Sequence, residues 1–105
     1  MTLNTMPSTG QLAGRRILVT GAARGLGFAF AQTLCQQGAQ LVMADLRAEL
    51  LSEAVAKLRA MGFEAHGVAF DASNPASIEQ CAQQAVKTLG GLDGLVNNAA
   101  VTDSG

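Results

Sequence analysis

The stretch that decides the fold of this chain is RILVTGAARGLG, residues 16–27. Its first part, ILVT, is a short continuous apolar run, which is typical of a strand buried on both faces of a parallel sheet. The run passes directly into three glycines in the pattern G-x-x-x-G-x-G, at Gly21, Gly25 and Gly27, and a helical apolar period begins at Gly25. The stretch therefore predicts a strand, a tight glycine turn and a helix in immediate succession.

Each glycine of this turn has a physical role. Gly21 allows the tight turn, Gly25 removes a Cβ where the backbone must approach a pyrophosphate, and Gly27 lets the helix pack close to the strand. The pyrophosphate then lies on free N–H groups at a helix N-terminus, where the helix dipole favours negative charge. Glycines also occur in ordinary turns and caps, so it is their position between a strand and a helix that favours dinucleotide binding.

Three further apolar runs, at residues 40–44, 65–70 and 94–97, alternate with segments of helical period. Strands that alternate with helices predict an α/β fold with a parallel sheet. Because crossovers between parallel strands are right-handed, we expect a doubly wound Rossmann-type sheet of order 3-2-1-4 with three helices, two on one face and one on the other. Ligands bind where such an order reverses, here between the first and fourth strands.

Apolar spacing predicts the buried face of each helix. The first helix begins near Gly25, the second covers residues 47–61, and the third begins with Asn74 as its cap and Pro75 at its first position. The side chains expected to face the sheet are Leu26, Phe30, Ala31, Leu34 and Cys35 in the first helix, Leu51, Ala54, Val55, Leu58 and Met61 in the second, and Ile78, Cys81, Ala82, Ala85 and Leu89 in the third.

Composition excludes several classes of function. Charged residues make up 14% of the 105 residues and the net charge is −1, so there is no basic stripe for nucleic acid or for an anionic membrane. No apolar run reaches the roughly 18 residues of a membrane span, and residues 1–14 lack the features of a secretion signal. We therefore expect a cytoplasmic protein. Cys35, Cys81 and the lone His66 have no metal-ligand spacing, and we interpret all three as structural.

Asp45 follows the second strand directly, at about the distance beyond the glycine turn where dinucleotide-binding folds place an acid for the adenosine ribose. A carboxylate there accepts hydrogen bonds from both ribose hydroxyls and repels a 2′-phosphate, which favours NAD over NADP. The alternative is an ordinary helix N-cap. Arg24 argues the other way, because a guanidinium in the turn can reach a 2′-phosphate, although it can equally be a solvated loop residue. On balance we expect NAD, with NADP the less favoured cofactor.

Taken together, these motifs resemble the N-terminal part of a short-chain dehydrogenase/reductase. The resemblance covers roughly residues 12–105 and depends on TGAARGLG, on Asp45, on Asp71 after the third strand and on the segment Asn97-Asn98-Ala99-Ala100 after the fourth. It implies that Asp71 bonds the adenine amino group, with the Ala72 N–H beside it. The alternative for Asp71 is a turn residue that leads into the next helix.

The resemblance also implies a role for the paired asparagines. Their segment lies along the adenosine side of the cofactor in the family, and its second Asn bonds the Thr of the glycine turn, which here means Asn98 and Thr20. A plain turn is the alternative. Ala100 stands where the family usually has Gly, so we expect slightly altered packing there. The predicted cofactor-binding residues are Gly21, Ala23, Arg24, Gly25, Leu26, Gly27, Asp45, Leu46, Asp71, Ala72, Asn97, Asn98 and Ala99.

The family transfers hydride between a nicotinamide and a carbonyl or alcohol by means of a Tyr-x-x-x-Lys pair and a Ser. The Lys lowers the pKa of the Tyr, which is otherwise about 10. This sequence contains no Tyr. The resemblance therefore implies the cofactor-binding half of an NAD(P)-dependent oxidoreductase, inactive by itself and without catalytic residues of its own.

The same resemblance implies a domain organisation and partners. We expect residues 1–13 to form a flexible arm and residues 14–105 to be the N-terminal part of one Rossmann domain, incomplete relative to the family. The remainder of the enzyme is expected to cover an apolar face on the first three strands and the bare edge of the fourth. A homodimer or homotetramer and a small carbonyl or alcohol substrate are the partners it implies, although the sequence does not identify the substrate.

Two other kinds of function compete with this hypothesis. One is a non-catalytic dinucleotide-binding module that senses NAD and regulates a partner. The other is a methyltransferase that binds S-adenosylmethionine, which also has a glycine turn and an acid after its second strand. The glycine spacing and the paired asparagines weigh against the methyltransferase.

Overall fold

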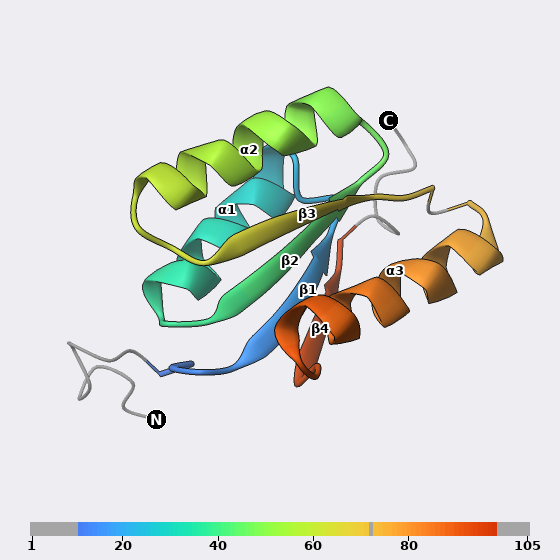
Figure 1. The fold of residues 1–105 in the computed structure, drawn as a ribbon. Helices are drawn as coiled ribbons and strands as arrows, with labels where there is room; N and C mark the ends of the chain where they lie inside the picture. Colours follow the sequence, from blue (N-terminus) through green and yellow to red (C-terminus); the bar gives the residue numbers. More distant parts are fainter. Residues whose placement is uncertain (1–10, 72, 99–105) are drawn as a thin grey trace.

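The computed structural model describes residues 11–71 and 73–98. Strands and helices alternate along this part of the chain, as Figure 1 shows. In chain order the elements are β1 (Arg16–Thr20), α1 (Gly25–Gln36), β2 (Gln40–Asp45), α2 (Ala48–Ala60), β3 (Ala65–Ala69), α3 (Pro75–Leu89) and β4 (Gly94–Asn97). β2 extends one residue further than predicted, so that Asp45 is its last residue.

The four strands form one parallel sheet in the order β3-β2-β1-β4, which confirms the predicted α/β fold and the predicted order. Thr20, the last residue of β1, is in register with Ala44 of β2 on one side and with Asn97 of β4 on the other. The carboxyl ends of these three strands therefore meet at one edge of the sheet, and the glycine turn leaves β1 at that edge.

The core has two layers, because the side chains of each strand alternate between the two faces of the sheet. Helices α1 and α2 cover one face and α3 crosses the other (Figure 1). Val19, Leu41 and Met43 pack on the side of α1 and α2, whereas Leu18 and Val42 pack on the side of α3. This alternation explains why both strands are apolar at successive positions.

We predicted an exposed apolar face on the first three strands. This prediction is wrong for β1 and β2, because all their apolar residues are buried. The reason is that α3 packs across β1, β2 and β3 together, so one helix covers the second face of each. Exposure is found instead on the two edge strands of the described sheet: on β3, where Gly67 and Ala69 are exposed, and on β4, where the side chain of Leu95 is 57% exposed.

The predicted buried face of α1 is confirmed at Ala31 and Cys35 and is wrong at Leu26 and Phe30. Its buried residues are Gly27, Ala31 and Cys35, while Leu26 and Phe30 are 65% and 42% exposed. The helix approaches the sheet so closely that a Cβ on Gly27 would overlap the carbonyl oxygen of Gly21. Small side chains therefore face the sheet, and the large ones turn outward.

Two other predicted core residues are largely exposed. Met61 is 50% exposed because it follows the last turn of α2, where the chain already turns away. Ile78 is 46% exposed because α3 begins to bury its side chains only at Cys81. The remaining predicted core residues of α2, from Leu51 to Leu58, are buried.

The helix ends follow the sequence signals. The side chain of Asn74 accepts a hydrogen bond from the N–H of Ala76, 3.0 Å away, and Pro75 occupies the first helical position. Gly90 ends α3 in the left-handed conformation, with φ of 82°, a conformation that favours glycine. Within residues 11–71 and 73–98, no helix combines the length and the apolar character of a membrane span.

An ion pair joins β1 and β4 at the end of the sheet opposite to the glycine turn. The guanidinium of Arg16 contacts both carboxylate oxygens of Asp93, at 3.0 and 3.3 Å, and the Arg16 N–H donates to Asp93 at 2.9 Å. The Asp93 N–H returns a bond of 2.7 Å to the carbonyl of Arg16. These contacts hold the start of β4 in register with β1, and so position Asn97 at the other end of the strand.

Candidate functional site: the glycine turn and its anchors

The backbone of the glycine turn requires glycine at two positions for its conformation. Gly21 and Gly25 have φ angles of +64° and +61°, a region where a residue with a Cβ is strained. A Cβ added at Gly25 would meet no atom within 4 Å. The surface above Gly25 is therefore open, and glycine leaves the backbone accessible there.

The first turn of α1 faces this open surface. Its N-cap residue is Arg24, in extended conformation, and no side chain caps the helix. The first N–H groups of any α-helix have no partner within the helix and carry a partial positive charge. With Leu26 pointing outward, this N-terminus can bind an anionic group.

Asp45 connects the glycine turn to the segment that leads into α2. Its Oδ2 accepts a hydrogen bond from the N–H of Ala23 at 3.1 Å, and its Oδ1 accepts one from the N–H of Arg47 at 3.0 Å. The residue is only 9% exposed. The N-cap alternative is wrong in its simple form, because the N-cap of α2 is Arg47 and no side chain caps that helix.

The paired asparagines bond the glycine turn, but in a different way from the prediction. Asn97, the first of the pair, accepts the hydroxyl hydrogen of Thr20 at 2.8 Å. Asn98 donates instead to the carbonyl oxygen of Gly21 at 3.3 Å. The expected bond from Asn98 to Thr20 is wrong because Thr20 and Asn97 are register partners whose side chains share one face of the sheet, while the next residue points to the other face.

Asp71 lies exposed after β3, within a turn that leads to α3. Its Oδ1 accepts bonds from the hydroxyl and the N–H of Ser73, at 2.7 and 2.9 Å, and these two bonds lower the pKa of Asp71 below its ordinary value. Its own N–H donates to the Ser77 hydroxyl at 3.0 Å. Asp71 therefore stabilises the turn that leads to α3, and its contact with adenine stays a prediction. Ala72, Ala99 and Ala100 lie outside the described residues.

The structure brings most of the described site residues together at one edge of the sheet, but not Asp71. The glycine turn, Asp45 and the two asparagines meet at the carboxyl edge of β2, β1 and β4, whereas Asp71 belongs to the turn after β3, beyond β2 in the sheet. Sequence reasoning missed the N–H of Arg47 as an anchor of Asp45. The signal was present, since Asp side chains commonly bond the N–H two residues further on.

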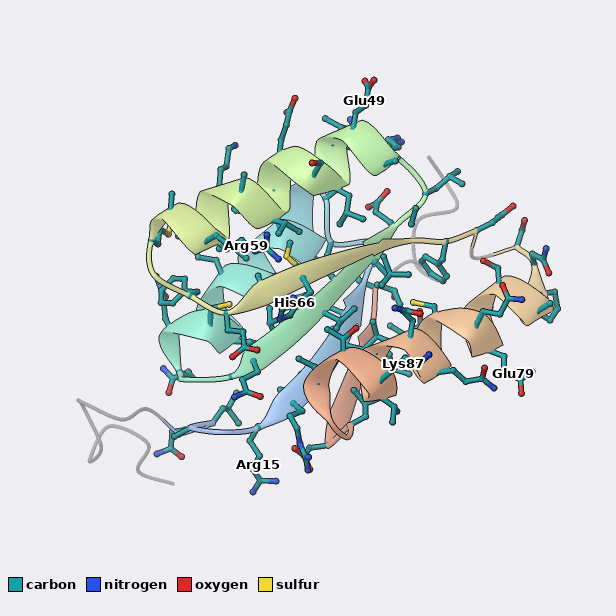
Figure 2. All side chains as sticks on the ribbon, in the orientation of Figure 1. Arg15, Glu49, Arg59, His66, Glu79 and Lys87 are labelled. Carbon is teal, nitrogen blue, oxygen red and sulfur yellow. The ribbon has the colours of Figure 1, made fainter. Side chains whose placement is uncertain are left out.

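Other polar and sulfur side chains serve the fold. His66 lies near Arg59 (Figure 2), and its Nδ1 is 3.4 Å from the Arg59 guanidinium. Its Nε2 is 3.2 Å from the Glu64 carboxylate. Cys35 and Cys81 are buried and unpaired, and burial raises the pKa of Cys35 to about 11. No group of three or more potential metal ligands occurs in the part of the chain that the structure describes.

A hollow of about 710 Å³ lies along α2 and β3. Its lining is mostly small and apolar, as at Ala56, Gly67 and Ala69, with Arg59 the one charged residue among those that line it. None of the lining residues belongs to the predicted site. The candidate site is therefore the open surface of the glycine turn and not this hollow.

The sequence profile described as short chain dehydrogenase matches residues 15–105, which is nearly the whole chain. The chain belongs to the short-chain dehydrogenase family. A curated relative, 5-keto-D-gluconate 5-reductase of Escherichia coli (strain K12), is 39% identical over 90 residues. That match covers 86% of this chain and 35% of the relative, so the chain spans about a third of the length of the relatives that it matches.

Solved structures of this family share the fold. A short chain dehydrogenase/reductase from Burkholderia phymatum in complex with NAD superposes with a TM-score of 0.77 at 37% identity, covering 80% of this chain and 30% of that protein. A short chain dehydrogenase from Burkholderia cenocepacia J2315 in complex with NADP gives a TM-score of 0.79 at 35% identity, covering 84% and 36%. Family members of similar identity therefore occur with either dinucleotide.

Proposed function

We propose that this short-chain dehydrogenase chain is the cofactor-binding part of an NAD(P)-dependent oxidoreductase that transfers hydride between a nicotinamide and a carbonyl or alcohol. The observation that carries the proposal is the glycine turn itself. It presents the uncapped N-terminus of α1 beside a glycine whose missing Cβ leaves the backbone open, which is the arrangement that binds a pyrophosphate in dinucleotide folds. The dinucleotide supplies the hydride chemistry when it is bound.

Each part of the site has a role in this proposal. The N–H groups at the start of α1 hold the pyrophosphate, and Asp45, at the end of β2, faces the adenosine ribose. Asp71 contributes to the adenine site together with Ala72, and the segment of Asn97, Asn98 and Ala99 lies along the adenosine. Ala23, Arg24 and Leu46 border the same surface.

NAD is the cofactor that we propose over NADP. A carboxylate at the end of β2 repels a 2′-phosphate, and the carboxylate of Asp45 is held in place by two N–H groups of the backbone. Arg24, at the N-cap of α1, favours NADP instead, since a guanidinium in the turn can pair with a 2′-phosphate.

We propose further that residues 14–105 are the N-terminal part of one Rossmann domain, that residues 1–13 form an arm, and that catalysis needs further residues. The support is that the 105 residues contain no Tyr to act as the family's acid and base. Leu95, exposed on β4, is consistent with further chain or a second subunit against that strand. A small carbonyl or alcohol substrate and a homodimer or homotetramer are the partners of the complete enzyme.

The test is a binding and turnover comparison on the chain as it stands. Calorimetry with NAD, NADP and S-adenosylmethionine should show binding of the nicotinamide dinucleotides, with NAD the tighter. NADH oxidation on a panel of carbonyl compounds should show no turnover. Binding of S-adenosylmethionine alone would instead support a methyltransferase, and turnover by this chain would refute the proposed inactivity.

A further inference from the structure

Strand β3 is an edge of the sheet that the structure describes, where it pairs with β2 alone. The N–H of Leu41 in β2 donates to the carbonyl of Glu64 at 3.1 Å. Backbone groups of successive strand residues point to alternate edges, so every second residue after Glu64 also faces β2. The N–H and C=O groups of Ala65, Gly67 and Ala69 therefore point to the open edge, where such a row of groups is a template for a further strand.

The sheet is hollow on both faces beside this edge. The hollow of about 710 Å³ between α2 and β3 and a second one of about 350 Å³ between β3 and α3 both include Gly67 and Ala69 in their linings. Side chains of a strand alternate between the two faces of a sheet. A strand placed against β3 would therefore direct its side chains into the two hollows in turn, so the edge has room for it.

The flank of α2 beside this edge carries small side chains in its middle and opposite charges at its two ends. Ala48, Ser52 and Ala56 line the larger hollow and are exposed, and small side chains let another helix approach closely. Glu49 lies in the first turn of α2 and Arg59 in the last, at opposite ends of the helix (Figure 2). An antiparallel second copy of α2 would therefore place Glu49 of each copy against Arg59 of the other.

The strand edge and the helix flank share one possible symmetry axis. A Cβ added to Gly67 would meet the side chains of Val55 and Leu51, at 3.1 and 3.3 Å, so Gly67 lies level with the middle of α2. A two-fold axis beside Gly67 would pair β3 with its own copy in antiparallel orientation. The same axis would pass α2 between Glu49 and Arg59, so the strands and the charges would match in one arrangement, as a closed two-fold interface requires.

We propose that the open edge of β3 and the adjoining flank of α2 form a two-fold interface with a second copy of this chain. The two β3 strands pair antiparallel about Gly67, and Glu49 of each copy pairs with Arg59 of the other. The inference rests on the homodimer of the proposed function and names its surface. It does not involve the cofactor site, because β2 separates β3 from β1 and the glycine turn.

Arg59 has an alternative role that the test must exclude. Its Nε donates to the carbonyl of Ala65 at 2.8 Å and so covers one group of the open edge. Charged side chains at an edge can prevent strands from pairing. In the proposed interface the guanidinium moves to Glu49 of the second copy, and the Ala65 carbonyl accepts a bond from the second strand.

The test is a charge exchange followed by sedimentation equilibrium. Glu49→Arg and Arg59→Glu each replace two attractions by two repulsions in the dimer, and the double variant restores both attractions with the charges reversed. Glu79→Arg is the control, because Figure 2 shows Glu79 projecting from α3 and the residue is exposed and lines neither hollow. The strand edge is measured separately, by NMR hydrogen exchange of the unmodified protein at low and at high concentration.

We expect the unmodified protein to form dimers and each single variant to raise the dimer dissociation constant by about tenfold, since exposed ion pairs are individually weak. The double variant should return to the unmodified value, and the control should match it. A monomeric unmodified protein overturns the proposal. A dimer that Glu49→Arg leaves unchanged also overturns it, because association then uses another surface or Arg59 only protects the edge.

Hydrogen exchange tests the pairing of the strands themselves. The amides of Gly67 and Ala69 should exchange several-fold more slowly at high protein concentration, whereas the Val68 amide, which faces β2, should exchange at the same rate at both. Exchange of Gly67 and Ala69 that does not depend on concentration overturns the strand pairing. This result is decisive also if a charge variant does not fold, since it uses the unmodified protein.

Titration of the same samples with NAD keeps the two proposals separate. A monomer that binds NAD overturns this interface and leaves the proposed cofactor site intact. A dimer that binds neither NAD nor NADP, but dissociates in the single variants and reforms in the double variant, supports the interface and refutes the proposed cofactor site.

Discussion

Replacing Gly25 by Ala separates the conformational role of this glycine from its role in binding. At a φ of +61° an Ala is strained by about 1–2 kcal/mol, and no atom lies within 4 Å to clash with the new Cβ. Gly62, at the end of α2, is a matched control, since its φ is +90° and its added Cβ likewise meets nothing within 4 Å. Both variants should therefore lose a similar free energy of unfolding, which corresponds to a fall of roughly 4–16 °C in Tm for a domain of this size.

Binding should distinguish the two variants. The Cβ of Gly25→Ala occupies the open surface where we propose that the pyrophosphate approaches the first N–H groups of α1. Losing hydrogen bonds to a charged ligand costs about 1.5–3 kcal/mol, so NAD should bind roughly 10- to 100-fold more weakly. Gly62→Ala should bind NAD as the unmodified protein does.

Thermal unfolding followed by calorimetric titration with NAD, at a temperature where each variant is folded, measures both effects. The reasoning is refuted if Gly25→Ala binds NAD with unchanged affinity. It is refuted equally if Gly62→Ala loses as much affinity as Gly25→Ala, because the loss would then reflect general destabilisation.

Three further predictions follow from the packing and the ionic contacts. Gly27→Ala should destabilise the protein more than Gly25→Ala does, because its Cβ would overlap the backbone of Gly21; equal Tm values for the two variants would contradict this close packing. The bond with Arg16 lowers the pKa of Asp93, so the contribution of this pair is present above the unfolded pKa of about 3.9 and is lost as the pH falls through the lower folded value. Denaturant unfolding at pH 7 and at pH 3 should accordingly show less pH dependence for Asp93→Asn than for the unmodified protein, and equal pH dependence would show that the pair contributes nothing. Burial raises the pKa of Cys35 to about 11, so iodoacetamide at pH 8 should label this thiol only after unfolding, and rapid labelling of the folded protein would refute its burial.

Local sequence patterns were sufficient to predict the helices and strands and the order of the strands in the sheet. Each strand is a short apolar run, and the caps at Asn74 and Gly90 are signalled by residue types whose conformational preferences are strong. The sheet order follows from the handedness of the crossovers once the strands are known. The same order predicts that the glycine turn, Asp45 and the asparagines lie at one edge of the sheet, because the carboxyl ends of parallel strands meet there.

The faces of the helices were less predictable. Leu26 and Phe30 have the spacing of a buried stripe, yet both are exposed. Spacing identifies which residues share a face, but the distance between helix and sheet decides whether that face admits large or small side chains. At α1 the contact of Gly27 with the turn keeps the helix close to the sheet, so Ala31 and Cys35 occupy the interface.

The fold class, the strand order and the glycine turn as candidate site were predictable from the amino acids alone, because they depend on residue types at short range and on chirality. Three features became evident only in three dimensions: the asparagine that bonds Thr20, the cover that α3 gives to the second face of β1 and β2, and the bond by which Asp45 holds the N–H of Ala23. These features depend on the register between strands and on distances across the sheet. Strand register and distances across the sheet depend on residues far apart in the chain, so local sequence does not predict them.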